Sequence, residues 1–464
     1  MQIYFVHSSI ADANKIRSLK RKEHIMKKIA VIGAGSFNFT RAIVRDIFSF
    51  PALSDSAIEL VDIPEGEEKM EAARLVIQKL IDEGGYKGTV HSGFDRRAAL
   101  EGADGVLITI RSDKPEVWAK DLTIPEKYGV TYSVGDTRGP AGIFRFLRSA
   151  PILREICRDI EELCPNALVL NYANPMAMLC RYLQGETSLN VTGLCHSVQG
   201  TSEMLAQWLG ADMKDITYLC AGINHQAFYL DYKWKGEDAY PLIRKLLENE
   251  EYYNKELVRN EMFLNLGYYP TESSGHNSEY NAWFRKRPDL IEKYCTHGTG
   301  WNPGHTNFSI GEIAKRDAAR GEEMRKMLDS PIDLKRGHEY AAYIFNAVFG
   351  DGELFEFNGN IRNFGLIDNL PYGACVEVPV LASKYGLKAM HVGDMPRQLA
   401  AIINTNAQVE ELAVEGCIEG DKTKIFHAVL NDPLTAAVCS MREAKALTDE
   451  LFEANREYLP QFKF

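Results

Sequence analysis

The chain has 464 residues, of which 45% are hydrophobic and 25% are charged, and its formal net charge is −11. This composition is typical of an ordinary globular protein, and the length exceeds what one hydrophobic core usually supports, so two domains are expected. The acidic balance, without runs of Lys and Arg interleaved with aromatics, argues against a nucleic-acid partner, and no apolar stretch is long enough to span a membrane.

Residues 1–25 precede the first predicted strand and lack the apolar segment and cleavage site of a secretory signal. We expect them to form an N-terminal extension. The nine cysteines are scattered and odd in number, which fits reduced thiols better than a disulfide framework. These features predict a cytoplasmic protein that acts on a small molecule.

Residues 26–195 alternate short β-branched runs with segments of helical periodicity, the pattern of a parallel sheet with crossover helices. Strands are expected at residues 29–33, 58–62, 105–110, 167–171 and 190–194, and helices at 67–83 and 143–164. The order of these elements predicts a Rossmann-like, doubly wound α/β domain.

Residues 196–464 are richer in helical patterns. Helices are expected at residues 240–264, 313–327, 337–349, 399–415 and 442–454, a strand at 375–380, and a turn-rich loop at 271–277. We expect a helix-rich α+β domain that carries the substrate, metal and oligomerisation surfaces, in an arrangement similar overall to that of lactate dehydrogenases.

A glycine turn follows the first predicted strand, in Gly33-Ala34-Gly35-Ser36-Phe37-Asn38. Its first two glycines permit a tight turn and close approach of a pyrophosphate, but Asn38 replaces the usual third glycine, so a purely structural turn remains the alternative. Asp62 ends the next strand, where a carboxylate accepts from both ribose hydroxyls and disfavours a 2′-phosphate. The pattern therefore predicts NAD rather than NADP. The expected cofactor-binding residues are Gly33, Gly35, Ser36, Phe37, Asp62 and Asn171.

Cys195 and His225 are candidate metal ligands. Cys195 ends a predicted parallel strand, where doubly wound folds bind their ligands, and His225 lies in a polar break after an apolar run. A thiolate and a neutral imidazole both bind divalent transition metals, and so small a ligand set leaves room for substrate oxygens. Taken singly, each residue fits a buried core position equally well.

Three further segments carry polar groups. Asn171 and Asn174 follow a strand end, where amides can orient hydroxyl groups or form a turn. Asp136 projects from a glycine-rich loop, either as a catalytic or hydroxyl-binding acid or as a helix cap. The loop 272–280 is dense in titratable groups and fits a site or a polar surface turn.

Taken together, these segments resemble glycoside hydrolase family 4, the NAD-dependent glycosidases. The resemblance extends from about residue 26 to residue 460. It is carried by the glycine turn, the Gly135-Asp136-Thr137 loop and residues 171–176, 193–200, 222–225 and 360–371. Residues 195–201, 220–228 and 269–274 are similar in particular to bacterial α-galactosidases of the melibiase type.

The resemblance implies hydrolysis of α-galactosides by a redox route. C3 of the sugar is oxidised by NAD, the C2 proton is removed, the aglycone is eliminated, water adds, and the hydride returns. The resemblance also implies a divalent ion, commonly Mn²⁺, held by Cys195 and His225 and bound to the C2 and C3 oxygens. Members of the family are usually dimers or tetramers, so a homodimer or homotetramer is expected.

The resemblance further implies roles for single residues. His196 is the expected proton donor to the aglycone, and Asn174 the expected substrate-orienting amide. Tyr280 is the expected C2 base, with Glu272 as its alternative. Other α-glycosidases of the family, α-galacturonidases above all, remain open, because Arg111 or another cation can bind a carboxylate or phosphate. A 2-hydroxy-acid dehydrogenase and a non-catalytic NAD-binding sensor are the alternatives from other classes.

Overall fold

The computed structural model describes residues 26–112, 114–296 and 304–464. Its first half forms a parallel sheet whose strands alternate their side chains between two buried faces. In β1, Ala30 and Ile32 enter one hydrophobic cluster and Ile29 and Val31 enter another. The strands stand in the order β3 (Thr89–Gly93), β2 (Ala57–Val61), β1 (Lys28–Ile32), β4 (Gly105–Ile108), β5 (Leu168–Asn171) and β6 (Val191–Leu194). This order is that of a Rossmann fold and confirms the predicted fold class.

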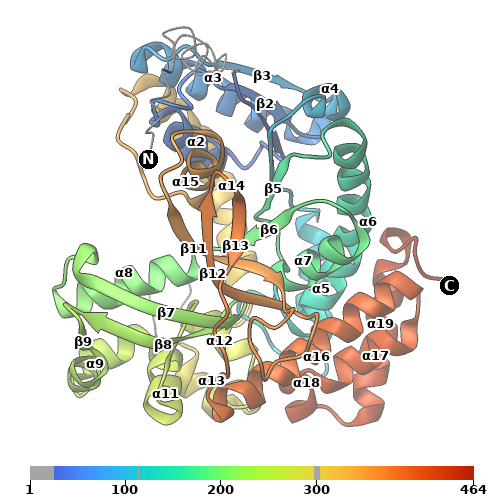
Figure 1. The fold of residues 1–464 in the computed structure, drawn as a ribbon. Coiled ribbons are helices and arrows are strands. Elements are labelled where there is room, and N and C mark those ends of the chain that lie inside the picture. Colours follow the sequence, from blue (N-terminus) through green and yellow to red (C-terminus); the bar gives the residue numbers. More distant parts are fainter. Residues whose placement is uncertain (1–25, 113, 297–303) are drawn as a thin grey trace, which may run out of the picture.

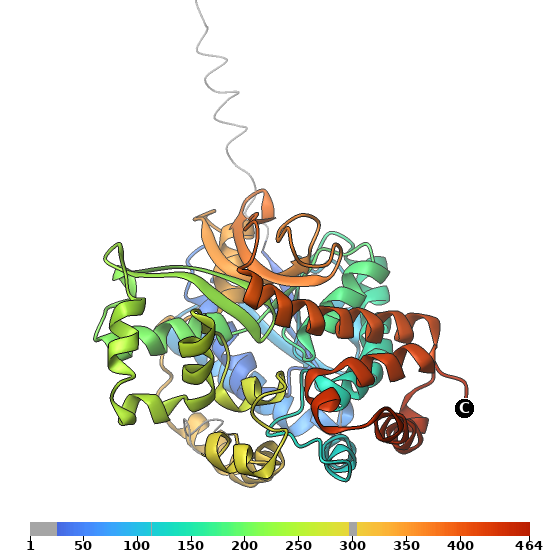
Figure 2. The same cartoon turned by 90° about the horizontal axis from the view of Figure 1, so that it is seen from below.

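Helices cover both faces of this sheet (Figure 1). One face packs against α2 (Phe37–Phe48), α3 (Glu67–Gly84) and α15 (Tyr340–Phe349). The other packs against α6 (Gly139–Leu163) and α7 (Met176–Glu186), with α5 (Pro115–Glu126) beside them. The C-terminal helices α16 (Arg397–Glu419), α17 (Lys422–Asn431) and α19 (Met441–Asn455) complete this second layer, and Figure 2 shows them beside the helices of the first half.

An antiparallel half continues the same sheet beyond β6. Residues 359 and 360 of β11 pair with residues 194 and 193 of β6. Beyond them the order runs β11 (Phe355–Arg362), β12 (Cys375–Ser383), β7 (Ile216–Ile223), β8 (Gln226–Trp234) and β10 (Tyr269–Pro270), with β13 (Gly386–Ala389) beside β12 and β9 (Glu237–Asp238) beside β8. The expected domain boundary between residues 195 and 196 stays a prediction. The sheet and one hydrophobic cluster both contain residues from either side of this boundary.

The predicted parallel strands are confirmed to within two residues at each end. The strand at 375–380 and the helices at 313–327, 337–349, 399–415 and 442–454 are also confirmed, within longer or slightly shifted bounds, the first of them as α14 (Phe308–Asp329). The expected N-terminal extension at residues 1–25 lies outside the described residues. Within the described ranges, no helix is long and apolar enough to cross a membrane.

Two expectations for the second half were wrong. The single helix at 240–264 is three helices, α9 (Tyr240–Leu246), α10 (Glu250–Lys255) and α11 (Leu257–Leu266). Asn249 caps α10 by accepting from the amide of Glu251, and Glu256 breaks the run with φ −141°. The loop at 271–277 contains the start of α12 (Ser274–Glu279), which Ser273 caps at the amide of His276. In both places a side-chain cap begins a helix at a residue that the sequence pattern did not indicate.

Candidate active site

A cavity of about 700 Å³ lies at the carboxyl ends of β4, β5 and β6, where doubly wound sheets bind their ligands. The loop before α6, the turn between β7 and β8, and helices α8 (Ser197–Leu209), α11, α12 and α14 contribute further residues to its walls. Seven of the side chains singled out in the sequence line this cavity: Arg111, Asp136, Asn174, Cys195, His196, His225 and Glu272. The fold therefore gathers residues that are up to about 160 positions apart.

The glycine turn after β1 forms a close cradle. Gly33 has φ 91°, and a Cβ there would lie 2.7 Å from the backbone nitrogen of Ile110. A Cβ on Gly35 would lie 2.6 Å from Oδ2 of Asp62, which already accepts a 2.5 Å hydrogen bond from the Gly35 amide. Ser36 is exposed at the start of α2. Only glycine fits at these two positions, and the turn brings the chain into the N-terminus of α2, where a phosphate is favoured.

Two predicted cofactor contacts are not supported by the structure. Phe37 is 4% exposed and packs into the core beneath α2. Asn171 is fully buried, and its amide is closed within its own turn, donating to the carbonyl of Ala173 and accepting from the amide of the same residue. Phe37 thus serves the core and Asn171 its own turn, and neither is among the described residues that line the cavity.

Cys195, His225 and Glu272 bring three potential metal ligands together. Nε2 of His225 lies 3.2 Å from Sγ of Cys195 and 3.4 Å from Oε2 of Glu272. All three ligand atoms lie within 4.8 Å of one another. Two ligands bonded to one ion at about 2.0–2.3 Å are separated by about 3–4 Å. The donor set therefore fits a divalent transition ion, and the structure adds Glu272 to the two ligands that the sequence predicted.

The backbone is left-handed at two of these positions. His225 is the second residue of the two-residue turn between β7 and β8 and has φ 62°. Glu272 has φ 68°. Such a conformation costs about 1–3 kcal/mol in a residue with a side chain and persists only where the surroundings fix it, as at functional sites.

The ionisation states of the three groups suit a metal ion. Burial lowers the pKa of His225 to about 4, so its imidazole is neutral at pH 7 and offers a lone pair. Burial opposes ionisation of Glu272, but the adjacent His225 and His276 lower its pKa overall. Burial and the nearby Glu377 and Glu272 raise the pKa of Cys195 to about 12. The thiol would lose its proton as a cation binds.

Tyr280 lies behind His225. Nδ1 of His225 contacts the hydroxyls of Thr137 at 3.0 Å and Tyr280 at 3.2 Å, which leaves Nε2 to face Cys195. Tyr280 is fully buried and is not among the described residues that line the cavity. Burial raises the pKa of Tyr280 well above its ordinary value. The structure therefore does not support Tyr280 as the C2 base, and its hydroxyl orients a metal ligand instead.

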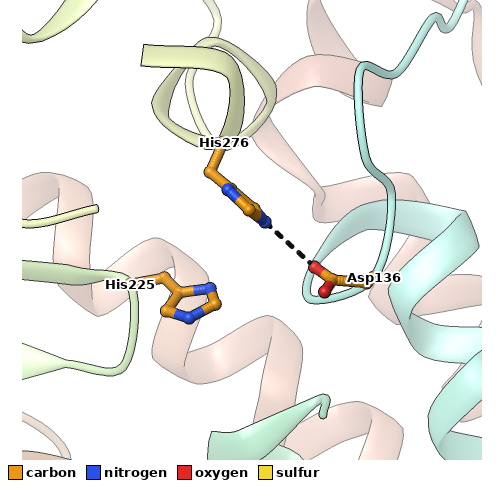
Figure 3. A group of neighbouring side chains, drawn as sticks. All are labelled: Asp136, His225 and His276. Carbon is orange, nitrogen blue, oxygen red and sulfur yellow. Dashed lines mark hydrogen bonds and ion pairs between the residues drawn. The ribbon is translucent and has the colours of Figure 1, made fainter. Parts of the chain in front are cut away.

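Asp136, His225 and His276 come from three different elements and point toward one another (Figure 3). His276 bridges two carboxylates, with Nε2 3.2 Å from Oδ1 of Asp136 and Nδ1 3.0 Å from Oε1 of Glu272. Burial disfavours its charged form, but the two carboxylates raise the pKa of His276 well above its ordinary value. No feature of the sequence singles out His276 beyond the density of titratable groups at 272–280.

Asp136 serves as the anchor of His276. Burial opposes its ionisation, but His276 lowers the pKa of Asp136 overall, and the hydroxyl of Thr137 donates to Oδ1 at 2.7 Å. The N-cap position of α6 is Arg138, so the helix-cap alternative for Asp136 was wrong. An ionised carboxylate accepts and orients protons, and it does not act as an acid.

His196 lines the cavity at the start of α8 (Ser197–Leu209), with 47% of its side chain exposed. Its Nε2 lies 2.8 Å from Oε2 of Glu339, and its ring stacks on Tyr172 with centroids 5.9 Å apart. Burial works to lower the pKa of His196, but Glu339 raises it overall. Asp46 fixes the partner by accepting a 3.1 Å hydrogen bond from the Glu339 amide. This pair keeps a proton on an imidazole that substrate can reach.

Asn174 adds a hydrogen-bond acceptor. Its Oδ1 is buried and has no hydrogen-bond partner within residues 26–112, 114–296 and 304–464, although the residue lines the cavity. Buried polar atoms are nearly always paired, so an unpaired one at a cavity wall fits a donor supplied by a ligand.

Comparison with known proteins places these residues in a family. Residues 28–211 match the sequence profile described as family 4 glycosyl hydrolase, and residues 220–435 match the profile of its C-terminal domain. An α-galactosidase of Bacillus subtilis (strain 168) is 36% identical over 448 residues, which cover 94% of this chain and 100% of that protein. An α-galactosidase of Rhizobium meliloti (strain 1021) is 33% identical, and the match covers 94% of this chain and 89% of that protein.

The fold is similar to that of a crystal structure of 6-phospho-α-glucosidase from gut microorganisms in complex with NAD and Mn²⁺. The TM-score is 0.78 at 18% identity, and the match covers 95% of this chain and 100% of that chain. The resemblance drawn from the sequence is thus confirmed, and the chain belongs to glycoside hydrolase family 4.

Proposed function

We propose that this glycosidase hydrolyses α-galactosides and requires NAD and a divalent metal ion such as Mn²⁺. The observation that carries the proposal is the gathering of Cys195, His225 and Glu272 in a cavity at the carboxyl edge of the parallel sheet whose first strand, β1, leads into the glycine turn. The similarity to two α-galactosidases supports the choice of sugar. The complex of a structural relative with NAD and Mn²⁺ supports the choice of cofactors.

When bound, NAD would supply reversible hydride exchange at C3 of the sugar, and the divalent ion would supply positive charge that acidifies the C2 and C3 positions. The N-terminus of α2, just after the glycine turn, is placed for the pyrophosphate, and Asp62 for the ribose hydroxyls. Cys195 and His225 would hold the ion, with the carboxylate of Glu272 beside them. The neutral His225 binds without first losing a proton, and the ionised Glu272 adds a negative charge next to the ion.

Proton transfers fall to side chains at the cavity wall. His196 is bonded to Glu339 through Nε2, and in its protonated form it delivers the proton of its other ring nitrogen, Nδ1, to the glycosidic oxygen as the aglycone leaves. Oδ1 of Asn174 accepts a hydrogen bond from a sugar hydroxyl and so fixes the ring beside His196. Together these contacts hold the substrate in one orientation, which is a large part of catalysis.

We assign removal of the C2 proton to Glu272. It lines the cavity, whereas Tyr280 is not among the described residues that do. Its pKa is lowered, so the carboxylate is in the form that a base requires. Its Oε1 accepts from His276, which Asp136 holds in place. A carboxylate that also contacts the metal ligand His225 is close to the carbon that the ion acidifies.

The α-galacturonidase reading remains the alternative within the family. Arg111 lines the cavity and would be the cation to bind a sugar carboxylate. A 2-hydroxy-acid dehydrogenase, the reading from another class, differs in its cofactor balance, because it converts NAD⁺ to NADH without returning the hydride.

The test of the proposed function is an assay with a panel of 4-nitrophenyl glycosides. We expect release of nitrophenol from the α-galactoside to exceed that from the α-glucoside, the α-galacturonide and the 6-phosphoglycosides. Omission of NAD⁺ or of Mn²⁺ should abolish it, and no net NADH should accumulate during turnover. Preferential cleavage of the galacturonide, or stoichiometric NADH, would refute the proposal.

Replacement of Asp62 tests the cofactor cradle. A charge-assisted hydrogen bond contributes about 1.5–3 kcal/mol, so Asp62→Asn should weaken NAD⁺ binding about 10- to 100-fold. Loss of the negative charge should also narrow the preference for NAD⁺ over NADP⁺, because the 2′-phosphate no longer meets a carboxylate. Calorimetric titration of each cofactor measures both effects, with Glu65→Gln, an exposed neighbour, as the matched control. An unchanged NAD⁺ affinity would remove Asp62 from the site.

A further inference from the structure

Glu256 is a buried carboxylate in the cavity wall that none of the roles above uses. It precedes α11, and its side chain forms no capping hydrogen bond with the described start of that helix. Oε2 accepts from Nε of Arg259 at 2.7 Å, from Oγ of Ser274 at 2.7 Å and from the Ser274 amide at 3.0 Å. Oε1 is equally buried but has no partner among the residues that the structure places.

This unpaired oxygen points to a ligand. A buried carboxylate oxygen without a donor is costly, and native structures rarely leave one unpaired away from a binding site. Oε2 is saturated by three donors that hold the carboxylate in one orientation. The remaining oxygen therefore fits a hydroxyl group that enters the cavity and donates to it.

The surroundings of Glu256 favour a neutral ligand. Arg259 is 4% exposed, and its other nitrogens contact Oγ of Thr201 at 2.9 Å and Sδ of Met204 at 3.0 Å. All four side chains line the cavity. The guanidinium charge is already matched by Glu256, so this wall offers no net cation to an anionic sugar. A carboxylate or phosphate that met Oε1 would bring like charges together in a site shielded from water.

The chain places Glu256 beside the proposed metal ligands. Ser274, which donates twice to Oε2, is two residues after Glu272. In the proposed function the C2 and C3 oxygens of the sugar face the ion, and C1 carries the aglycone. The ring hydroxyls that remain free to reach this wall are those at C4 and C6.

We propose that Glu256 determines sugar specificity: its Oε1 accepts a hydrogen bond from the C4 or C6 hydroxyl of a neutral hexoside, and its charge excludes sugars with a carboxylate or phosphate at C6. This inference rests on the proposed function. It assigns the discrimination against uronides and phospho-sugars to one carboxylate that no sequence motif singles out.

The test compares the wild-type holoenzyme with Glu256→Gln, using 4-nitrophenyl α-galactoside, α-galacturonide, and the 4-deoxy and 6-deoxy α-galactosides. The variant should lose about 10-fold or more in kcat/KM for the galactoside, and the galactoside-to-galacturonide ratio should fall at least about 30-fold. Removal of the hydroxyl that Glu256 binds should slow the wild type about 10-fold but leave the variant nearly unaffected, as in a double-mutant cycle.

Two further variants separate the effect of the charge from that of the hydrogen bond and control for the substitution itself. Glu256→Asp retains the charge, but its shorter side chain moves the carboxylate oxygens away from the sugar. This variant should therefore lose activity on the galactoside and still reject the galacturonide. The matched control is Glu261→Gln on α11, whose carboxylate bonds Tyr253 and Asn265 and is not among the described side chains of the cavity. A Glu256→Gln enzyme with the wild-type substrate ratio, or equal sensitivity of both enzymes to both deoxy sugars, would overturn the inference. Failure of the wild type to cleave any α-galactoside would instead overturn the proposed function.

Discussion

Replacing Cys195 by serine is expected to reduce bound Mn²⁺ at least about 100-fold in affinity and to lower kcat about 1000-fold or more. The serine hydroxyl keeps the size of the side chain but gives up its proton far less readily than the thiol does beside a cation. His225 and Glu272 would remain in place, because their contacts with Thr137 and His276 do not involve Cys195. Metal content by mass spectrometry after dialysis, and steady-state kinetics at saturating Mn²⁺, measure the two effects.

The control for this experiment is Cys439→Ser. Cys439 is half-buried at the edge of a hydrophobic cluster, and its Sγ hydrogen-bonds the carbonyl of Tyr128. It is far in sequence from the ligands. Binding of NAD⁺ should be close to wild type in both variants, which separates loss of the ion from loss of the fold. A Cys195→Ser protein with full metal content would show that the ion, if any, is held elsewhere.

Replacing His196 by glutamine is expected to slow hydrolysis of methyl α-galactoside by about 100- to 10,000-fold, the usual contribution of a general acid. The loss with 4-nitrophenyl α-galactoside should be much smaller, because nitrophenolate leaves without a proton. Glutamine keeps a polar group that can bond Glu339, so metal content and NAD⁺ binding should not change. Equal losses for both substrates would contradict the assignment of His196 as the proton donor.

The role of His196 as proton donor determines whether the rate rises or falls with pH. Glu339 raises the pKa of His196 against the opposing effect of burial, and the acid is active only while protonated. The rate with the methyl glycoside should therefore fall as pH rises through that pKa. Glu339→Gln removes the carboxylate, so this fall should move to lower pH. If the rate of the Glu339→Gln variant fell at the same pH as that of the wild type, the role of Glu339 would be contradicted.

Five of the six parallel strands were predictable because each is a short, mainly aliphatic run that is largely buried, and the alternation with helices then indicates a doubly wound sheet. The sixth, β3, was missed because its sequence is polar and its positions are mostly exposed or intermediate. The antiparallel half was not. Strand β7 mixes exposed, intermediate and buried positions, and its pairing joins Gly222 to Glu377, residues about 150 positions apart. Such long-range pairing leaves no local pattern in a single sequence.

The candidate site was predictable where a strand end or a polar break marked it, as at Cys195 and His225. Glu272 and His276 depend on the pairing of β10 with β8 and on the cap that Ser273 gives α12, neither of which the hydrophobic pattern reveals. Tyr280 shows the opposite error. The resemblance to the family implied that Tyr280 is the base, but the direction of its side chain is set by Arg138 and His225, which pack against it from distant elements.

The pairing of β6 with β11 has a consequence for how such enzymes can be divided or recombined. A fragment that ended after β6 would present an unpaired strand edge, and the apolar surface that α16, α17 and α19 now cover, to other molecules. Unpaired strand edges of this kind pair with strands of other molecules, and such fragments aggregate. The nucleotide-binding portion is thus not a transplantable module, and swapping catalytic halves between relatives would require exchange of nearly the whole chain.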